Sequence, residues 1–226
     1  MKNVLVFIIA LACLGAAPGL AQVKAKPLNV ATIDKANAWK TINVIANPVE
    51  LDGREGAYVR SLADSANGIV GLALPIGVEF DTGVIELDLK GKSERGRSFL
   101  GVAFNVVDDK TFEAIYFRPF NFKADEPFRG RAVQYIAWPT NTWEHLRKNY
   151  PGKFEQPVDS VPDPDDWFRA RIEVTRMQVR VFVNDAKAPS LVVDRLATDK
   201  TKRPAGLFVD SADGYYANVR LIPRNE

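Results

Sequence analysis

The feature that most constrains this chain is an alternation of apolar and other side chains with a period of two residues. It recurs in short runs that are separated by clusters of glycine, proline, asparagine and aspartate. Neighbouring residues of a β-strand point to opposite faces, so this period predicts strands, whereas a helix would need a period near 3.6. Many short strands without long intervening helices predict an all-β fold of two antiparallel sheets packed as a sandwich.

The predicted strands occupy most of the chain after the N-terminal segment. They cover residues 41–46, 57–61, 68–74, 84–89, 100–107, 112–118, 131–138, 168–175, 178–184, 207–209 and 215–222. One segment departs from this pattern. Asn141 stands three residues before Glu144, which is a helix-capping signal. Trp143 and Leu146 then fall on one helical face, and Pro151 ends the helix. The sequence predicts one short helical insertion.

Residues 1–21 have the layout of a secretory signal peptide. Lys2 gives a positive start, residues 4–14 are apolar, and Gly19 and Ala21 are small residues placed for cleavage before Gln22. The apolar run is shorter than the roughly 20 residues of a transmembrane helix, and no later stretch is long enough either. We expect a secreted or periplasmic protein with a single domain over residues 22–226.

Cys13 leaves a second form of export open. Leu11-Ala12-Cys13 resembles a bacterial lipoprotein cleavage site, which would attach a lipid anchor through Cys13. Because Cys13 is the sole cysteine, a disulfide scaffold and a cysteine-rich metal site are excluded.

The charge balance argues against a nucleic-acid partner. Thirty Lys and Arg residues stand against 28 Asp and Glu residues, which gives a net charge of +2 and no basic stripe. No cofactor motif is present. Two acidic groups could supply oxygens to Ca²⁺, although neither has the spacing of a calcium loop. They are Asp159, Asp163, Asp165 and Asp166 in a proline-rich loop, and Asp210 and Asp213 in a turn.

Several strand motifs, taken in order, resemble one known class of domain. They are the runs at residues 83–89, 100–104, 115–119, 132–135, 167–174 and 179–184. They are similar to the concanavalin A-like or laminin-G-like jelly rolls of bacterial secreted proteins, and most of all to the 3-keto-disaccharide hydrolase domains. The resemblance covers residues 39–223 and implies two curved sheets whose concave face or loop rim takes up sugar.

Glu86 and Asp88 are the candidate catalytic residues. They lie two apart on one predicted strand and therefore point to the same face. They resemble the Glu-x-Asp-x-Glu strand of laminarinase-like glycoside hydrolases, but Lys90 stands where that family has its acid/base glutamate. A second carboxylate would have to come from elsewhere, and Glu113, Glu173 and Asp210 stay open for that role. The alternative is that Glu86 and Asp88 form the solvated face of a half-buried strand.

The candidate ligand-binding residues are polar or aromatic side chains on the same strands and around the helical insertion. They are Asn105, Tyr116, Arg118, Gln134, Trp138 and His145. A guanidinium group beside an aromatic ring is suited to a sugar, because it offers planar donors next to a flat apolar face. If the strands are neighbours, one concave surface would be lined by Glu86, Asp88, Asn105, Tyr116, Arg118 and Gln134. The alternative is that Arg118 simply forms an ion pair with Glu86 or Asp88.

Three functions remain open at this stage. The first is a carbohydrate-binding domain without catalysis. The second is a hydrolase of a disaccharide or 3-keto-disaccharide. The third is a structural or adhesion domain with no small ligand. Fold alone does not decide among them, because one scaffold can support many functions.

Overall fold

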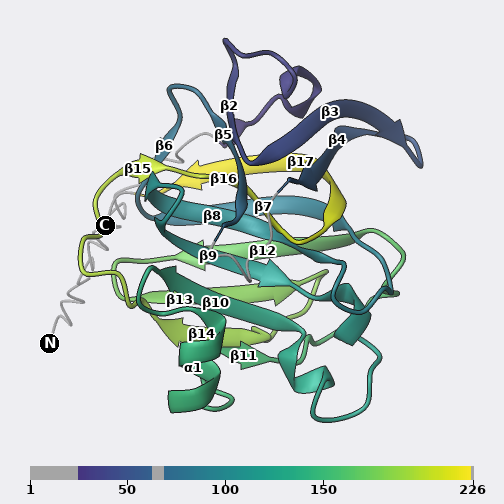
Figure 1. Cartoon of the computed structure of the whole chain (residues 1–226), viewed down its shortest axis with the longest axis vertical. Helices are drawn as coiled ribbons and strands as arrows, with labels where there is room; N and C mark the ends of the chain where they lie inside the picture. Colours follow the sequence, from purple (N-terminus) through teal and green to yellow (C-terminus); the bar gives the residue numbers. More distant parts are fainter. Residues whose placement is uncertain (1–24, 63–68, 225–226) are drawn as a thin grey trace, which may run out of the picture.

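The computed structural model describes residues 25–62 and 69–224, and these form two antiparallel sheets packed face to face (Figure 1). In the described residues one sheet has eight strands, in the order β14-β13-β12-β7-β17-β4-β3, with β1 paired to β17. Its strands are β1 (Lys26–Pro27), β3 (Val44–Leu51), β4 (Arg54–Ser61), β7 (Gly83–Lys90), β12 (Phe168–Val174), β13 (Gln178–Val183), β14 (Leu191–Asp194) and β17 (Asp213–Pro223).

The second sheet has seven strands within the same residues, in the order β11-β10-β9-β8-β16-β5-β2. Its strands are β2 (Trp39–Ile42), β5 (Gly71–Pro75), β8 (Phe99–Asp108), β9 (Thr111–Phe117), β10 (Val133–Trp138), β11 (Glu155–Gln156) and β16 (Gly206–Asp210). A two-stranded ribbon of β6 (Glu79–Phe80) and β15 (Arg203–Pro204) completes the β-structure. The predicted all-β sandwich is confirmed.

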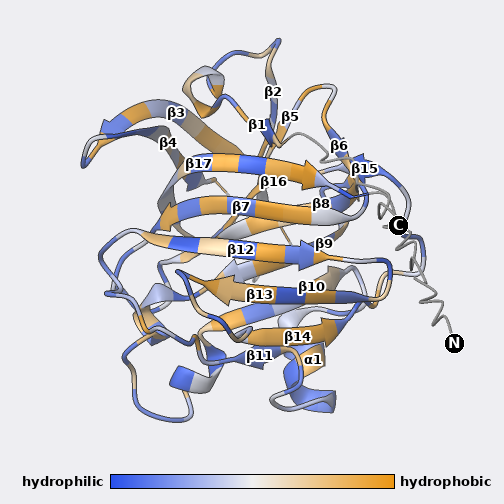
Figure 2. Cartoon of the chain, turned by 180° about the vertical axis from the view of Figure 1, so that it is seen from behind, coloured by the Kyte–Doolittle hydropathy of each residue, from blue (hydrophilic) through white to orange (hydrophobic). Residues whose placement is uncertain are grey.

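Alternate residues of each strand fill the space between the sheets. On β7 the inward residues are Ile85, Leu87 and Leu89, all at most 1% exposed. Phe117 of the seven-stranded sheet meets Phe168 of the eight-stranded sheet edge to face, with ring centroids 5.1 Å apart. Figure 2 shows the resulting alternation of hydrophobic and hydrophilic residues along the strands of the eight-stranded sheet. Burial of this apolar surface is the main force that holds the layers together.

The predicted strand at residues 41–46 is in fact two strands that belong to different sheets. Asn43 has a positive φ of 55°, which breaks the chain direction between β2 and β3. Asparagine tolerates this left-handed conformation better than other non-glycine residues, and its Nδ2 donates to the carbonyl of Val70. β14 was not predicted, and neither were the two-residue strands.

The predicted helical insertion is confirmed as α1 (Trp143–Asn149), but its cap is one residue later than expected. The Thr142 hydroxyl, not the Asn141 side chain, accepts from the backbone N–H of His145 at 3.3 Å. Leu146 anchors the helix in the core, and Pro151 follows its end.

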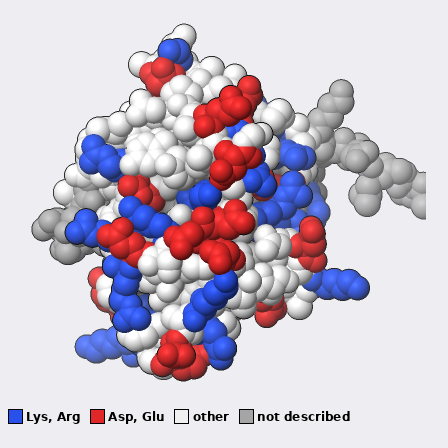
Figure 3. All heavy atoms as spheres, turned by 90° about the vertical axis from the view of Figure 1, so that its right-hand side faces the viewer, with Lys and Arg blue, Asp and Glu red and all other residues white. Residues whose placement is uncertain are grey.

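The signal peptide, its cleavage before Gln22 and the lipid anchor at Cys13 all fall outside the described residues. Across residues 25–62 and 69–224, no helix has the length and hydropathy needed to cross a membrane. Figure 3 shows Lys and Arg interspersed with Asp and Glu over one face of the molecule, so no broad basic surface is present on that side.

Candidate functional site

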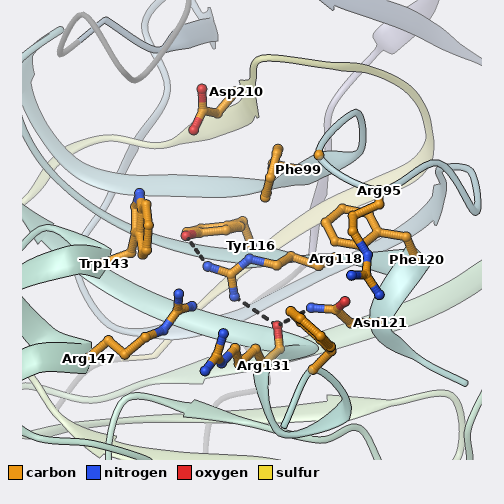
Figure 4. A pocket seen from close by; sticks show the side chains of 12 residues that line it. Arg95, Phe99, Tyr116, Arg118, Phe120, Asn121, Arg131, Trp143, Arg147 and Asp210 are labelled. Atoms are coloured by element: carbon orange, nitrogen blue, oxygen red, sulfur yellow. Dashed lines mark hydrogen bonds between the residues drawn. The ribbon is translucent and has the colours of Figure 1, made fainter. Parts of the chain in front are cut away.

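A cavity of about 240 Å³ opens on the outer face of the seven-stranded sheet (Figure 4). Its floor is the end of β9, and its walls come from the loop after β7, from α1 and from two short 3-10 turns, Pro119–Asn121 and Arg129–Arg131. We call this cavity the arginine pocket. Its volume is slightly below the about 300–1,000 Å³ of typical small-molecule sites, which suits a single ring-sized group.

Aromatic side chains supply much of the lining. In the described residues they are Phe99, Tyr116, Phe120, Phe128 and Trp143. The rings of Phe99 and Phe120 meet edge to face at 5.4 Å, and Tyr116 stacks on Phe208 at 5.4 Å. These contacts fix the rings on the sheet, so the pocket presents flat apolar surfaces without further ordering.

Arg118 crosses the floor of the pocket and is only 5% exposed. Its Nη2 donates to the Tyr116 hydroxyl at 2.8 Å and to Oε1 of Gln134 at 3.3 Å, while Nη1 donates to the Arg131 carbonyl at 2.8 Å. Three of the six residues predicted to share one surface, Tyr116, Arg118 and Gln134, are therefore brought together. Tyr116 and Arg118 line the pocket, whereas Gln134 lies behind them and orients Arg118.

Glu155 on β11 is a shared carboxylate beneath the pocket. Arg147 donates to it from Nε at 2.8 Å and from Nη2 at 2.6 Å. Arg118 Nη1 lies 3.8 Å and Arg131 Nε 4.0 Å from its carboxylate oxygens. One buried negative charge therefore faces three guanidinium groups.

Burial shifts the pKa of the groups on the pocket floor. It raises the pKa of Tyr116 well above its usual value, against the opposing charge of Arg118, so the phenol stays neutral. Burial also lowers the pKa of Arg118. For Arg147 burial acts in the same direction, but the hydrogen bonds and the charge of Glu155 outweigh it and raise the pKa. The floor thus offers a neutral hydroxyl group and fixed guanidinium donors.

The predicted grouping of Glu86 and Asp88 with Arg118 is wrong. β7 belongs to the eight-stranded sheet and β9 to the seven-stranded one, so the two sets of side chains project from opposite faces of the sandwich. Asp88 accepts from Nδ2 of Asn218 at 2.6 Å and lies 3.6 Å from both Arg54 Nε and Arg169 Nε. Asp88 is only 8% exposed, so it is a buried, ion-paired residue and the alternative of a solvated strand face does not describe it either.

The carboxylates considered as partners for Glu86 or Asp88 lie in three different places. Glu113 is fully buried between the sheets, where Arg195 donates from Nη2 at 2.5 Å and the Tyr135 hydroxyl at 2.6 Å. Glu173 lies on the same outer face of the eight-stranded sheet as Glu86 and Asp88, on the neighbouring strand β12, where it pairs with Arg171 and Arg180. Asp210 lines the arginine pocket instead.

Asn105, Trp138 and His145 also lie outside the arginine pocket. Asn105 sits in a β-bulge with φ 52°, which turns its Nδ2 toward Glu113 at 3.1 Å. Trp138 stacks on Phe112 with centroids 5.5 Å apart. His145 is exposed on α1 with its ring 6.5 Å from that of Tyr150.

The acidic residues weighed for calcium do not converge. Asp163 accepts from Lys123 Nζ at 2.8 Å, and Asp165 accepts from the backbone N–H of Ser93 at 2.7 Å. Within the described ranges, no group of three or more His, Cys, Asp or Glu side chains is arranged to hold a metal ion.

Much of the pocket was not predicted from the sequence. Arg95, Phe99, Phe120 and Phe128 were missed, and Glu155 lies in a strand of only two residues. A usable signal was the segment 118–131, in which arginine and phenylalanine residues join the end of one predicted strand to the start of the next. Functional residues often occur in such loops, which a rigid scaffold positions.

Comparison with solved structures identifies the fold. The chain matches a carbohydrate-binding module from Bacillus subtilis with a TM-score of 0.53 and 14% identity, over 80% of this chain and 93% of that one. The fold is a concanavalin A-like sandwich. A Bacillus subtilis protein of unknown function with a galectin-like fold matches with a TM-score of 0.50 and 14% identity, over 89% of this chain and 97% of that one. No family model and no curated protein matches this chain.

Proposed function

We propose that this protein binds carbohydrate in the arginine pocket. The observation that carries the proposal is a cavity in which aromatic faces and fixed hydrogen-bond donors meet on one side of a concanavalin A-like sandwich. Sugars have apolar ring faces and a rim of hydroxyl groups, so they need both kinds of contact. Tyr116 and Arg118 are the predicted contacts that lie in this pocket.

Binding without catalysis fits the carboxylates of the pocket better than hydrolysis does. A retaining glycosidase needs two carboxyl groups about 5–5.5 Å apart across the bond to be cleaved, one of them able to give up a proton. Glu155 does not line the pocket, and both of its carboxylate oxygens accept hydrogen bonds from Arg147 beneath the floor. The carbohydrate-binding module with the same fold offers an analogy for binding alone.

The proposal includes export of the protein. Residues 1–21 have the charge, apolar run and small residues of a signal peptide, and a carbohydrate-binding domain outside the cytoplasm would meet extracellular or envelope sugars. Mass spectrometry of the mature protein tests this. An N-terminus at Gln22 supports cleavage there, whereas a lipid-modified Cys13 would support the lipoprotein alternative.

Two tryptophans provide a matched test of the pocket. Trp143 lines it beneath Arg147, with 4.6 Å from the guanidinium carbon to the ring centroid. Trp167 has a similar partner, since the guanidinium carbon of Arg54 lies 5.0 Å from its ring centroid. Trp167 lies away from the pocket, and its Nε1 donates a hydrogen bond to Asp52. On a glycan array we expect Trp143→Ala to weaken binding about tenfold or more, and Trp167→Ala to leave it unchanged. Absence of any bound glycan, or loss of binding in Trp167→Ala alone, would refute the proposal.

A further inference from the structure

Guanidinium groups outnumber carboxylates around the arginine pocket. In the described residues Arg95, Arg118, Arg131 and Arg147 line it, while Asp210 is the one acidic residue in the lining. If Glu155 beneath the floor is counted as well, four positive charges face two negative ones, a local excess of +2. The whole chain has the same net charge of +2 spread over 226 residues, so the excess is concentrated here.

The excess of positive charge comes largely from arginines that are buried or partly buried, and not only from exposed side chains. Arg118 and Glu155 have side chains that are only 6% exposed, and Arg147 and Arg131 are about a quarter to a third exposed at 26% and 30%. A buried guanidinium group is expensive unless a negative charge satisfies it. Glu155 alone cannot neutralise Arg118, Arg131 and Arg147.

Arg95 places a further guanidinium group at the rim of the arginine pocket. Its guanidinium lies 4.1 Å from the centroid of the Phe128 ring, which holds it over the opening. No carboxylate among the described residues lies within ion-pair distance of it. In Figure 4 Arg147 and Arg95 approach the cavity from opposite ends, Arg131 lies below it and Arg118 crosses its floor, while Asp210 stands above. The pocket is therefore bordered by guanidinium groups along most of its rim and by an acidic side chain on the remaining side.

We propose that the arginine pocket selects a sugar unit that carries an anionic substituent, a carboxylate or a sulfate. This inference rests on the proposed function. Planar guanidinium groups form charge-assisted, often bidentate hydrogen bonds with such groups. The anionic substituent would lie over Arg118 and among the arginines that border the pocket, Arg95, Arg131 and Arg147. The sugar ring would face Trp143 and Phe99, and Asp210 would accept from a hydroxyl group.

The test uses matched sets of oligosaccharides on an array: a neutral backbone, the same backbone with uronic acid units, and the same backbone with sulfate esters. We expect at least one acidic member of a set to bind about tenfold more tightly than its neutral member. The comparison of uronate with sulfate identifies which substituent the pocket prefers. Binding of the acidic member should weaken as NaCl is raised, because salt screens exposed charges such as Arg95.

Arg95→Gln and Arg97→Gln form the matched pair of variants. Both arginines are exposed on the loop after β7, but only Arg95 lines the arginine pocket. We expect Arg95→Gln to weaken binding of the acidic sugar about fivefold, and to weaken it more than it weakens binding of any neutral sugar. Arg97→Gln should change neither.

The outcomes separate this inference from the proposed function. Neutral sugars that bind as well as acidic ones, with binding lost in Trp143→Ala, would overturn the anionic preference and leave the sugar site intact. Equal effects of Arg95→Gln and Arg97→Gln would also overturn it. No binding by any member of the sets would overturn both proposals.

Discussion

At the scale of single residues, Glu155 is the side chain on which the pocket floor depends most. It is 5% exposed and receives both hydrogen bonds of Arg147, with Arg118 and Arg131 within 4.0 Å. Without this carboxylate, buried guanidinium groups would face one another without compensation. The floor geometry of the pocket is therefore tied to the stability of the protein.

We predict that Glu155→Gln, which keeps the size of the side chain and removes its charge, lowers the free energy of unfolding by about 3 kcal/mol. Urea unfolding measures the loss. Asp163→Asn is the control, since Asp163 forms an exposed pair with Lys123 at 2.8 Å and should cost less than about 1 kcal/mol. Equal losses in the two variants would contradict the role assigned to Glu155.

Residue-level patterns in the sequence predicted part of this site. Tyr116 and Arg118 are two apart near the end of one strand, and the expectation that they share a face was correct, as their 2.8 Å hydrogen bond shows. The rule that residues two apart on a strand point to the same face also placed Glu86 and Asp88 together. This rule contains no information on which sheet a strand joins. That choice depends on pairing between distant segments, so the local pattern could not reveal that β7 and β9 lie in different sheets.

At the scale of elements, the centre of the seven-stranded sheet depends on close packing around Gly101. This residue lies on β8 opposite Tyr116 on β9 and Phe208 on β16. The Tyr116 and Phe208 rings stack with each other at 5.4 Å across it. A Cβ atom at this position would lie 2.0 Å from the Ile115 carbonyl oxygen.

We predict that Gly101→Ala costs about 1–3 kcal/mol of stability, because backbone and rings must shift to make room. Since Tyr116 forms the pocket floor, sugar affinity should fall as well. In Gly130→Ala, by contrast, the nearest atom to the new Cβ is Oε2 of Glu126 at 3.3 Å, the end of a flexible side chain. Thermal unfolding and a binding titration of both variants check this. A Gly101→Ala protein as stable as the Gly130→Ala protein would show that the packing is looser than described.

At the scale of the whole molecule, tyrosines buried in and around the two sheets tie stability to pH. Burial raises the pKa of Tyr116, Tyr135 and Tyr216 above the usual value near 10. Tyr216 also joins the sheets, since its hydroxyl donates to the Phe208 carbonyl at 2.6 Å. Well below pH 10 each tyrosine is protonated in both the folded and the unfolded chain, so these groups make no pH-dependent contribution there.

Above pH 10 the unfolded chain releases protons that the folded chain keeps, so we predict that stability falls as pH rises. The limiting slope is about 1.4 kcal/mol per pH unit for each such tyrosine. Urea unfolding between pH 8 and pH 11 measures it. Tyr216→Phe removes one titrating group and should make the fall shallower. Stability that stays constant or increases over this range would be inconsistent with the buried phenols.

The overall architecture was more predictable than the pocket. Two-residue periodicity marks most strands, and the order of the strand motifs resembles that of a known class of jelly roll. The two-sheet sandwich could therefore be predicted from the sequence. The pocket is built from loop residues such as Arg95, Phe120 and Phe128, whose positions have no repeating pattern. Their convergence with α1 over β9 is a property of the complete fold.

The central claim is that sugar binds in the arginine pocket, and the four tryptophan indole N–H groups can report this directly. A ¹H–¹⁵N NMR titration with a glycan that binds on the array should shift the Trp143 signal. Trp39, whose Nε1 donates to the Asn29 carbonyl, and Trp167, whose Nε1 donates to Asp52, should not move. A shift of Trp167 with no change at Trp143 would place the sugar on the other sheet and contradict the account.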